Sequence, residues 1–408
     1  MNVWRVPYPK FGAGPGLERC AAVAAKLRID LRAFGGRGAV IVGSNGKGST
    51  AAMCAALLRQ TTENVGLFTS PHLFALNERF RIGDDDISDA ELSVHWDRVR
   101  AAIEACGVEA SIGGFEFLFL IAADWFAARG CAHTVWEAGI GGRLDPVKLI
   151  EAQHVALTAL DFEHTALLGE KLEEIALEKI AAAPEGARLF VSEQAAPNAS
   201  VVRSAIGAYC AEHGVRVEYV APIESQLPLN GVHQKSNAAL AVKLAQALAP
   251  HSQAQLAAGL RATRWPGRLE VLSADPLVVI DVGHTPDGVA RALEGFEQLR
   301  GGRNAVLVCG VSEDKDTGAI VERLAPAFAA IICVAEQHKG APAAVIGAHA
   351  QSANPTAEIS LAESVADARR LALAKAKGGA VYVAGGLFLA AEFKAVQLGR
   401  DLGSLLFF

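Results

Sequence analysis

The sequence predicts an α/β protein with two domains, each built around a mainly parallel sheet. Apolar segments typical of buried strands alternate with helical segments along nearly all of the 408 residues. A glycine-rich turn, residues 43–50, follows one of these strands, and the segment Arg-Trp-Pro-Gly-Arg at 264–268 interrupts the alternation. Apolar strands separated by helices favour parallel sheets that are covered on both faces.

Individual elements follow from local patterns. The spacing of Ser88 and Glu91 is that of a capping box, which begins a helix. The apolar segment 115–128 predicts a buried helix that Gly130 ends, and it is too short to cross a bilayer. An alanine-rich helix is expected over 236–249. The segments with the apolar pattern of strands are 39–42, 65–69, 134–136, 155–160, 189–191, 277–280, 305–309, 330–334 and 380–383.

Composition narrows the class of protein. Hydrophobic residues make up 51% of the chain and charged residues 20%, which is typical of a globular protein. The net charge of -6, without a basic run, argues against nucleic-acid binding. Seven scattered cysteines indicate free thiols in a reducing compartment, and no apolar signal core opens the chain. We therefore expect a cytoplasmic protein, monomeric and without a membrane partner.

Residues 43–50 read GSNGKGST and stand between a strand and a helix. That layout wraps backbone N–H groups around phosphate, while Lys47 pairs with phosphate oxygens and Ser49 or Thr50 offers a hydroxyl to Mg²⁺. The common P-loop has Ser or Thr after the lysine and glycine six residues before it, where this chain has Gly48 and Ile41. A glycine-rich turn with an incidental lysine is the alternative. The candidate nucleotide-binding residues are Gly43, Ser44, Asn45, Gly46, Lys47, Gly48, Ser49 and Thr50.

These features define the expected domains. We predict a large P-loop NTPase-like domain with a parallel sheet over residues 1–268 and a linker over 269–276. A smaller Rossmann-like α/β domain is predicted over 277–408. Ligands in such folds bind at the carboxyl ends of the strands.

Three polar side chains each follow a predicted strand of the large domain, namely Ser70, Glu137 and His164. We expect them to share one edge of the sheet, where a hydroxyl, a carboxylate and an imidazole can hold Mg²⁺, although oxygen ligands are the usual preference. Each also has an ordinary interpretation. Ser70 precedes a proline and suits a turn, Glu137 suits a helix cap, and His164 suits the surface.

Further motifs follow the P-loop in a fixed order. They are Thr69-Ser70-Pro71-His72-Leu73, Asn77-Glu78-Arg79, Phe115-Glu116, residues 137–145 (EAGIGGRLD), His164-Thr165, Glu178-Lys179, residues 231–234 (GVHQ), Gly267-Arg268, residues 281–284 (DVGH) and Asp314-Lys315-Asp316. The series resembles the folylpolyglutamate synthase and dihydrofolate synthase family of the Mur ligase superfamily, over residues 4–393. That resemblance implies an ATP-dependent amide ligase that adds L-glutamate to a pterin-type acid, dihydropteroate or tetrahydrofolate, through an acyl phosphate.

The resemblance also implies roles for residues. Metal ligands for Mg²⁺ would be Ser49, Ser70, Glu137 and His164. The catalytic set would be Lys47, Glu137, His164 and Lys179, the last as a carbamate. ATP would also contact Gln234, Asn237, Arg268, Asp281 and His284. The acid would contact Pro71, His72, Asn77, Arg79, Phe115 and Glu116, and the amino acid Ser312 and Lys315, with His338 and Lys339 as further candidates.

Simpler interpretations remain for some of these residues. Gln234 and Asn237 suit a polar helix start, and Lys179 suits a solvated helix end. The chain also departs from the family pattern. It has Glu163 before His164 in place of aspartate, Lys179-Ile180-Ala181-Ala182, Pro146-Val147-Lys148, His284-Thr285 and His338-Lys339.

The departures lie mainly near the expected acid and amino-acid sites. They leave open a paralogue with the same chemistry on another acid or amine. A P-loop switch without ligase activity is a second alternative, which is disfavoured by the joint presence of Lys47, Glu137, His164 and Arg268. Phosphate release that requires both an acid and an amino acid would distinguish the ligases from the switch.

Overall fold

The computed structural model describes residues 4–193 and 199–407. The chain divides into two compact units. The first unit holds the residues up to Pro228 together with Gln234–Arg264, and the second holds Leu229–His233 and Trp265–Phe407. The chain therefore passes between the units near residues 228, 233 and 264.

The described strands of the first unit form one sheet of eight in the order β4-β3-β2-β5-β1-β6-β7-β8. All pairs from β2 to β8 are parallel, and β3 and β4 add an antiparallel edge. The strand before the glycine-rich turn is thus central. The strands are β1 Gly38–Val42, β2 Val65–Phe68, β3 Phe80–Ile82, β4 Asp85–Asp86, β5 His133–Glu137, β6 His154–Leu157, β7 Arg188–Ser192 and β8 Arg216–Val220.

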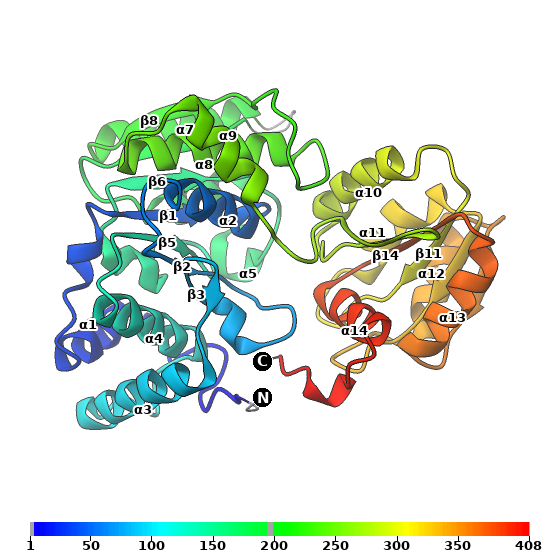
Figure 1. Ribbon diagram of the computed structural model, residues 1–408, viewed down its shortest axis with the longest axis horizontal. Helices are drawn as coiled ribbons and strands as arrows, with labels where there is room; N and C mark the ends of the chain where they lie inside the picture. Colours follow the sequence, from blue (N-terminus) through cyan, green and yellow to red (C-terminus); the bar gives the residue numbers. More distant parts are fainter. Residues whose placement is uncertain (1–3, 194–198, 408) are drawn as a thin grey trace. The chain divides into compact units, whose positions relative to one another are not determined.

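Helices of the first unit form packed groups: α2 packs on α8 and α9, and α1 packs on α3 and α4 (Figure 1). Ser88 accepts a hydrogen bond from the Glu91 amide at the start of α3, which confirms the expected cap. The helices are α1 Leu17–Lys26, α2 Lys47–Leu58, α3 Asp89–Cys106, α4 Gly114–Ala128, α5 Thr165–Leu168, α6 Leu172–Ile180, α7 Ala199–Glu212, α8 Gln234–Leu248 and α9 Gln253–Ala262, with 3₁₀ turns Leu31–Phe34, Leu76–Arg79 and Pro146–Ile150.

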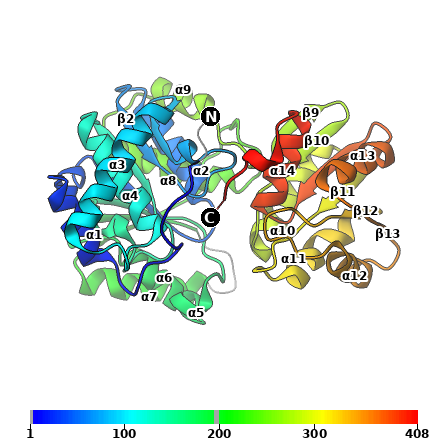
Figure 2. The same cartoon turned by 90° about the horizontal axis from the view of Figure 1, so that it is seen from below.

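The second unit has its own sheet, in the order β13-β12-β11-β14-β10-β9, and its own core. Helices α10, α11 and α12 lie on one side of this sheet and α13 and α14 on the other (Figure 2). The elements are β9 Glu270–Ala274, β10 Leu277–Ile280, α10 Pro286–Arg300, β11 Ala305–Cys309, α11 Thr317–Leu324, β12 Ala330–Cys333, α12 Ala343–Ala353, β13 Glu358–Leu361, α13 Val365–Ala376, β14 Ala380–Ala384 and α14 Leu387–Gln397, with 3₁₀ turns Ala325–Ala327 and Leu402–Ser404.

All of the predicted strands are confirmed to within a few residues, as β1, β2, β5, β6, β7, β10, β11, β12 and β14. Five strands were not predicted, namely β3, β4, β8, β9 and β13. Each lies at or near an edge of its sheet and carries polar residues, so its pattern lacks the apolar run that marks a buried strand.

The expected linker over 269–276 is wrong. Residues 270–274 form β9, which pairs antiparallel with β10 and so belongs to the second sheet. The main segment of the second unit accordingly begins at Trp265 rather than at residue 277, and Leu229–His233, expected in the first domain, also belongs to the second unit. The polar residues of β9 resemble a linker in sequence because this strand covers only an edge.

None of the helices in the described ranges combines the length and the apolar character needed to cross a membrane. All seven cysteines fall within the described ranges, and they are free thiols.

Candidate active site

The glycine-rich turn leaves β1 and leads directly into α2, which begins at Lys47. Gly43 and Gly46 have φ values of 144° and 93°, which L side chains rarely adopt. A Cβ on Gly46 would also collide with the side chain of Asn237. The turn therefore requires glycine at both positions, for conformation and for space.

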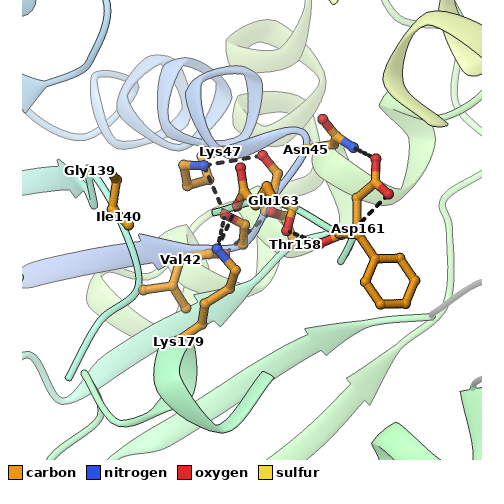
Figure 3. A network of polar contacts seen from close by, with 12 residues as sticks. Val42, Asn45, Lys47, Gly139, Ile140, Thr158, Asp161, Glu163 and Lys179 are labelled. Carbon is orange, nitrogen blue, oxygen red and sulfur yellow. Dashed lines mark hydrogen bonds and ion pairs between the residues drawn. The ribbon is translucent and has the colours of Figure 1, made fainter. Parts of the chain in front are cut away.

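The end of β6 anchors this turn from the side. The amides of Ser44 and Asn45 both donate to the Ala159 carbonyl, at 2.9 and 3.0 Å. The Asn45 side chain also donates to Asp161 at 3.2 Å (Figure 3). These bonds hold the backbone of the loop in the shape of a phosphate-binding turn.

Lys47 lies over the same turn. Its ammonium donates to the Gly43 carbonyl at 2.8 Å and to the Ser44 carbonyl at 3.1 Å, and its side chain is half-buried (Figure 3). The structure thus brings together the loop amides and the cation that the sequence predicts for phosphate. Gly48, Ser49 and Thr50 continue into α2 and are buried.

A second lysine contacts the loop from below. Lys179, in the last turn of α6, donates to the Gly43 carbonyl at 3.0 Å and to Glu163 at 2.6 Å (Figure 3). Burial lowers the pKa of Lys179 to about 8, with nearby Lys47 adding to the effect. Burial raises the pKa of Glu163, but Lys47 and Lys179 outweigh burial and bring it below its usual range. Lys179 is therefore a buried contact of the loop and not a solvated helix end.

Four predicted residues form a hydrogen-bonded cluster at the ends of β2 and β5. Glu137 is buried and accepts from the Ser70 amide at 2.9 Å. Arg79 donates from Nη1 to Ser70 Oγ at 2.8 Å and from Nε to His72 Nδ1 at 2.9 Å. Glu137 and Ser70 were predicted as metal ligands, and the structure places them side by side.

The donor set fits Mg²⁺ in part. Ser70 and Glu137 provide a hydroxyl and a carboxylate, and Mg²⁺ typically takes one or two carboxylates together with phosphate and water oxygens. His164 is exposed, with φ 48°, in the connection after β6. Within the described part of the chain, there is no group of three or more His, Cys, Asp or Glu side chains that could hold a metal ion by themselves. Hydroxyls, nucleotide and water would have to complete the coordination.

Asp145 supports the cluster, and the sequence prediction gave it no role. Its carboxylate is buried and accepts from the amides of Gly139, Ile140 and Val147 at 2.8 to 3.1 Å. Burial raises the pKa of Asp145 to about 6. These bonds shape the turn that follows Glu137. Its position at the end of the glycine-rich segment 137–145 was the signal in the sequence.

Gln234 and Asn237 begin α8 and are both buried. Asn237 donates to the Gln234 side chain at 2.9 Å and lies against Gly46 of the loop. The structure therefore places this pair beside the candidate nucleotide site rather than on a solvated helix start.

The residues predicted to contact the acid divide into two sets. Phe115 lies over Gly139 and against Phe68, and Pro71 is exposed after a cis peptide bond. Asn77 and Glu116 instead make contacts within the protein. Asn77 donates to the Ile87 carbonyl at 2.7 Å, and Glu116 pairs with Arg19 at 2.6 Å.

Three predicted nucleotide contacts lie together in the second unit. Asp281 follows β10, is buried, and accepts from the amides of Leu269 and Gly283 at 3.0 and 2.7 Å. Burial raises its pKa, while Arg268 lowers it. His284 Nδ1 lies 3.3 Å from the Val282 carbonyl. Asp281 thus organises the turn that carries His284.

The predicted amino-acid contacts follow β11 and β12. Ser312 is buried and donates to Glu336 at 3.3 Å. Glu336 was not predicted; it is buried, its Oε2 has no partner, and burial raises its pKa to about 7. Lys315 lies 3.4 Å from Asp314, and Lys339 is exposed with φ 56°.

His338 differs from these neighbours. Its ring contacts Phe388 and Phe407 at centroid distances of 4.4 and 5.2 Å, and its Nε2 is buried without a partner. Burial lowers its pKa, with Lys339 adding to the effect. Such a ring is a poor permanent cation, which leaves Lys315 and Lys339 as the better candidates.

Comparison with known proteins gives a consistent picture. Residues 267–387 match the protein family described as the Mur ligase, glutamate ligase domain. A probable bifunctional folylpolyglutamate synthase/dihydropteroate synthase of Halobacterium salinarum is 32% identical over 406 residues, covering 94% of this chain and 49% of that protein. The chain thus spans about half the length of the curated relatives first matched.

Two solved structures resemble the whole chain. Folylpolyglutamate synthase of Mycobacterium tuberculosis, complexed with ADP, has a TM-score of 0.87 and 25% identity, covering 96% of each chain. A bifunctional folylpolyglutamate synthase/dihydrofolate synthase with Mn, AMPPNP and L-glutamate bound has a TM-score of 0.81 and 25% identity, covering 97% of this chain and 99% of that one.

Proposed function

Because the chain belongs to the folylpolyglutamate synthase and dihydrofolate synthase family of the Mur ligases, we propose that it is an ATP-dependent amide ligase. It joins L-glutamate to a folate-type acid, dihydropteroate or tetrahydrofolate. One observation carries the proposal. The loop with Lys47 and the cluster with Glu137 follow the adjacent strands β1 and β5, in which Ile41 pairs with Glu137. The glycine-rich loop that would bind phosphate and the Glu137 carboxylate that would bind Mg²⁺ therefore follow neighbouring strands.

The chemistry proceeds in two transfers. An oxygen of the acid's carboxylate bonds to the γ-phosphorus of ATP, and the bond from that phosphorus to the bridging oxygen breaks, releasing ADP. The amine of glutamate then attacks the acyl carbon, inorganic phosphate leaves, and the amine loses a proton. Such transfers depend mainly on positioning and on stabilising negative charge.

Residues of the first unit supply that stabilisation. Lys47 and the loop amides hold the phosphate oxygens. Ser49, Ser70 and Glu137 would hold Mg²⁺, which when bound neutralises charge on the phosphates. His164 and a carbamate on Lys179 are proposed with them by family resemblance, and the Lys179 contact with the Gly43 carbonyl supports a role at this loop.

The second unit supplies the remaining contacts in this proposal. Arg268, Asp281 and His284 would contact ATP. Ser312 and Lys315 would contact glutamate, whose two carboxylates need fixed cations or several donors. We further propose that the protein is a monomer and is cytoplasmic; free cysteines, most of them buried, suit a reducing compartment.

Phosphate release tests the function directly. Purified protein with ATP and Mg²⁺ should release phosphate only when both dihydropteroate or tetrahydrofolate and L-glutamate are present, and mass spectrometry should detect the amide product. EDTA should stop the reaction and Mg²⁺ should restore it. ATP hydrolysis without either substrate, and with no amide formed, would instead indicate the nucleotide switch.

A divergent ligase is the second candidate, and Glu336 favours it. This acid lies 3.3 Å from Ser312, where glutamate is expected, and an ionised carboxylate there would repel a carboxylate substrate. The raised pKa of about 7 reduces that repulsion at neutral pH. A screen of amino acids at equal concentration decides between the two, since preference for an amino acid other than glutamate would support the divergent ligase.

A further inference from the structure

Arg79 lies at the centre of the loop that joins β2 to β3. It ends the 3₁₀ turn Leu76–Arg79, and only 4% of it is exposed. The sequence predicts a contact between Arg79 and the acid substrate. Burial to this degree directs the guanidinium toward groups of the protein instead, so its function has to be sought among its neighbours.

Two hydrogen bonds define the orientation of the guanidinium. Nη1 donates to Ser70 Oγ at 2.8 Å, and Nε donates to His72 Nδ1 at 2.9 Å. Since Nδ1 accepts, the neutral His72 ring carries its proton on Nε2. The fork of arginine serves two acceptors in fixed directions, which the single ammonium of lysine cannot reproduce.

Groups other than the Arg79 side chain also hold the loop. The carboxylate of Glu78 accepts from the amides of Leu73, Phe74 and Ala75 at 2.7 to 2.9 Å. The ends of the loop are joined by a backbone bond from the Thr69 amide to the Arg79 carbonyl at 3.1 Å. These bonds support the loop alongside the two hydrogen bonds of the Arg79 side chain.

Ser70 connects Arg79 to Glu137. The Ser70 amide donates to Glu137 Oε2 at 2.9 Å, so the same serine contacts Arg79 through its hydroxyl and Glu137 through its backbone. Burial lowers the pKa of Arg79 to about 10, and the negative charge of Glu137 opposes that shift. A buried guanidinium needs such a counter-charge, because removal from water is otherwise costly.

We propose that Arg79 is a positioning residue for the metal site: it fixes the Ser70 hydroxyl, beside the Glu137 carboxylate, in the orientation that binds Mg²⁺. The Ser70 oxygen has two lone pairs. One accepts from Arg79, which sets the side-chain torsion and leaves the other for a metal. This inference rests on the proposed function only in requiring that the chain bind a metal–nucleotide complex.

The test measures metal binding by the full chain without acid or amino acid. Mn²⁺ binding in the presence of AMPPNP is followed by electron paramagnetic resonance for Arg79→Lys, Ser70→Ala and the double variant. We expect Arg79→Lys to weaken Mn²⁺ binding about tenfold or more, as loss of a group that orients a ligand does. The double variant should bind no more weakly than Ser70→Ala, since both changes act through one hydroxyl.

Arg81→Lys is the matched control. Arg81 lies on β3 and donates to Asp86 at 3.0 Å, at the edge of the sheet. Its replacement should leave Mn²⁺ binding unchanged. Thermal unfolding of every variant separates loss of fold from loss of metal. If Arg79→Lys does not fold, the uncharged Arg79→Met suits the buried position and should show the same loss of Mn²⁺ binding.

Three results would overturn the inference. Unchanged Mn²⁺ affinity with a raised KM for the acid would make Arg79 a substrate contact. A lowered melting temperature with unchanged Mn²⁺ affinity would make it structural. Additive losses in the double variant would mean that it does not act through Ser70. A chain that binds Mn²⁺ and AMPPNP but forms no amide would refute the proposed function and leave this test valid.

Discussion

The carboxyl ends of the two sheets are built differently. In the first unit, charged side chains are buried and bonded to one another, as in the contact of Lys179 with Glu163 at 2.6 Å. In the second unit, the buried groups Asp281 and Glu336 are acids, while Lys315 and Lys339 are partly or fully exposed. The first arrangement buries its charged groups in contact with one another, and the second leaves these lysines at the surface.

This difference matches the chemistry proposed for each unit. Fixed charges in a buried site act strongly on phosphate because little water screens them. Burying such groups costs desolvation energy, so a network of this kind is weak evidence for stability and better evidence for function. Exposed lysines can select a carboxylate substrate without that cost, and their replacement changes affinity more than it changes the fold.

Separating the two units should have the largest effect. Fragments 1–264 and 265–408 should each fold, because each unit has its own core, and neither should form the amide alone. Circular dichroism and phosphate release measure the two properties. A cut within 270–274 is the comparison, since it removes β9 and should destabilise the second fragment. An unfolded 265–408 fragment would contradict the division.

Lys47→Ala should come next, with amide formation reduced about a thousandfold or more, because a fixed positive charge at the phosphates is lost. The melting temperature should change little, since the ammonium contacts only carbonyls of its own loop. Lys235→Ala is a control on a half-buried lysine paired with Glu224. Wild-type turnover in Lys47→Ala would refute the assignment of the phosphate site.

Glu336 should make stability depend on pH in the second unit. Its folded pKa of about 7 lies above the usual value of 4.5, so the folded state binds more protons between these values. Stability should therefore fall as pH rises from 4.5 to 7, by up to about 3 kcal/mol in total. Glu336→Gln should remove this slope in denaturant unfolding measured at pH 4.5 and pH 8. An unchanged slope would show that Glu336 ionises normally.

Replacing the exposed or partly exposed lysines of the second unit should have the smallest effect on activity. Lys315→Met or Lys339→Met should raise the KM for glutamate about tenfold, equivalent to about 1.4 kcal/mol, with little change in the KM for ATP. Lys377→Met is a control on a lysine that follows α13. If neither change affects glutamate, its carboxylates are recognised elsewhere, and the divergent ligase becomes the better reading.

Local chemistry in the sequence was sufficient for much of the fold and for the centre of the site. Apolar runs marked the buried strands, and the pattern GSNGKGST marked the loop between β1 and α2. Gly46 and Lys47 could be assigned because glycine conformation and charge are properties of single residues. Placing Ser70 and Glu137 on one edge required only that their strands be parallel.

Tertiary structure determined the properties that depend on contacts between residues. Nothing local to Arg79 shows that it is buried against Ser70, because that contact depends on how their loop folds. Glu116 is engaged with Arg19, which comes from a distant segment of the chain. The strand β9 is defined by pairing with β10 and not by its own polar residues. Glu336 acquires its raised pKa only from the surroundings in which it is buried. The sequence determined which groups are present, and packing determined which of them are free to meet a ligand.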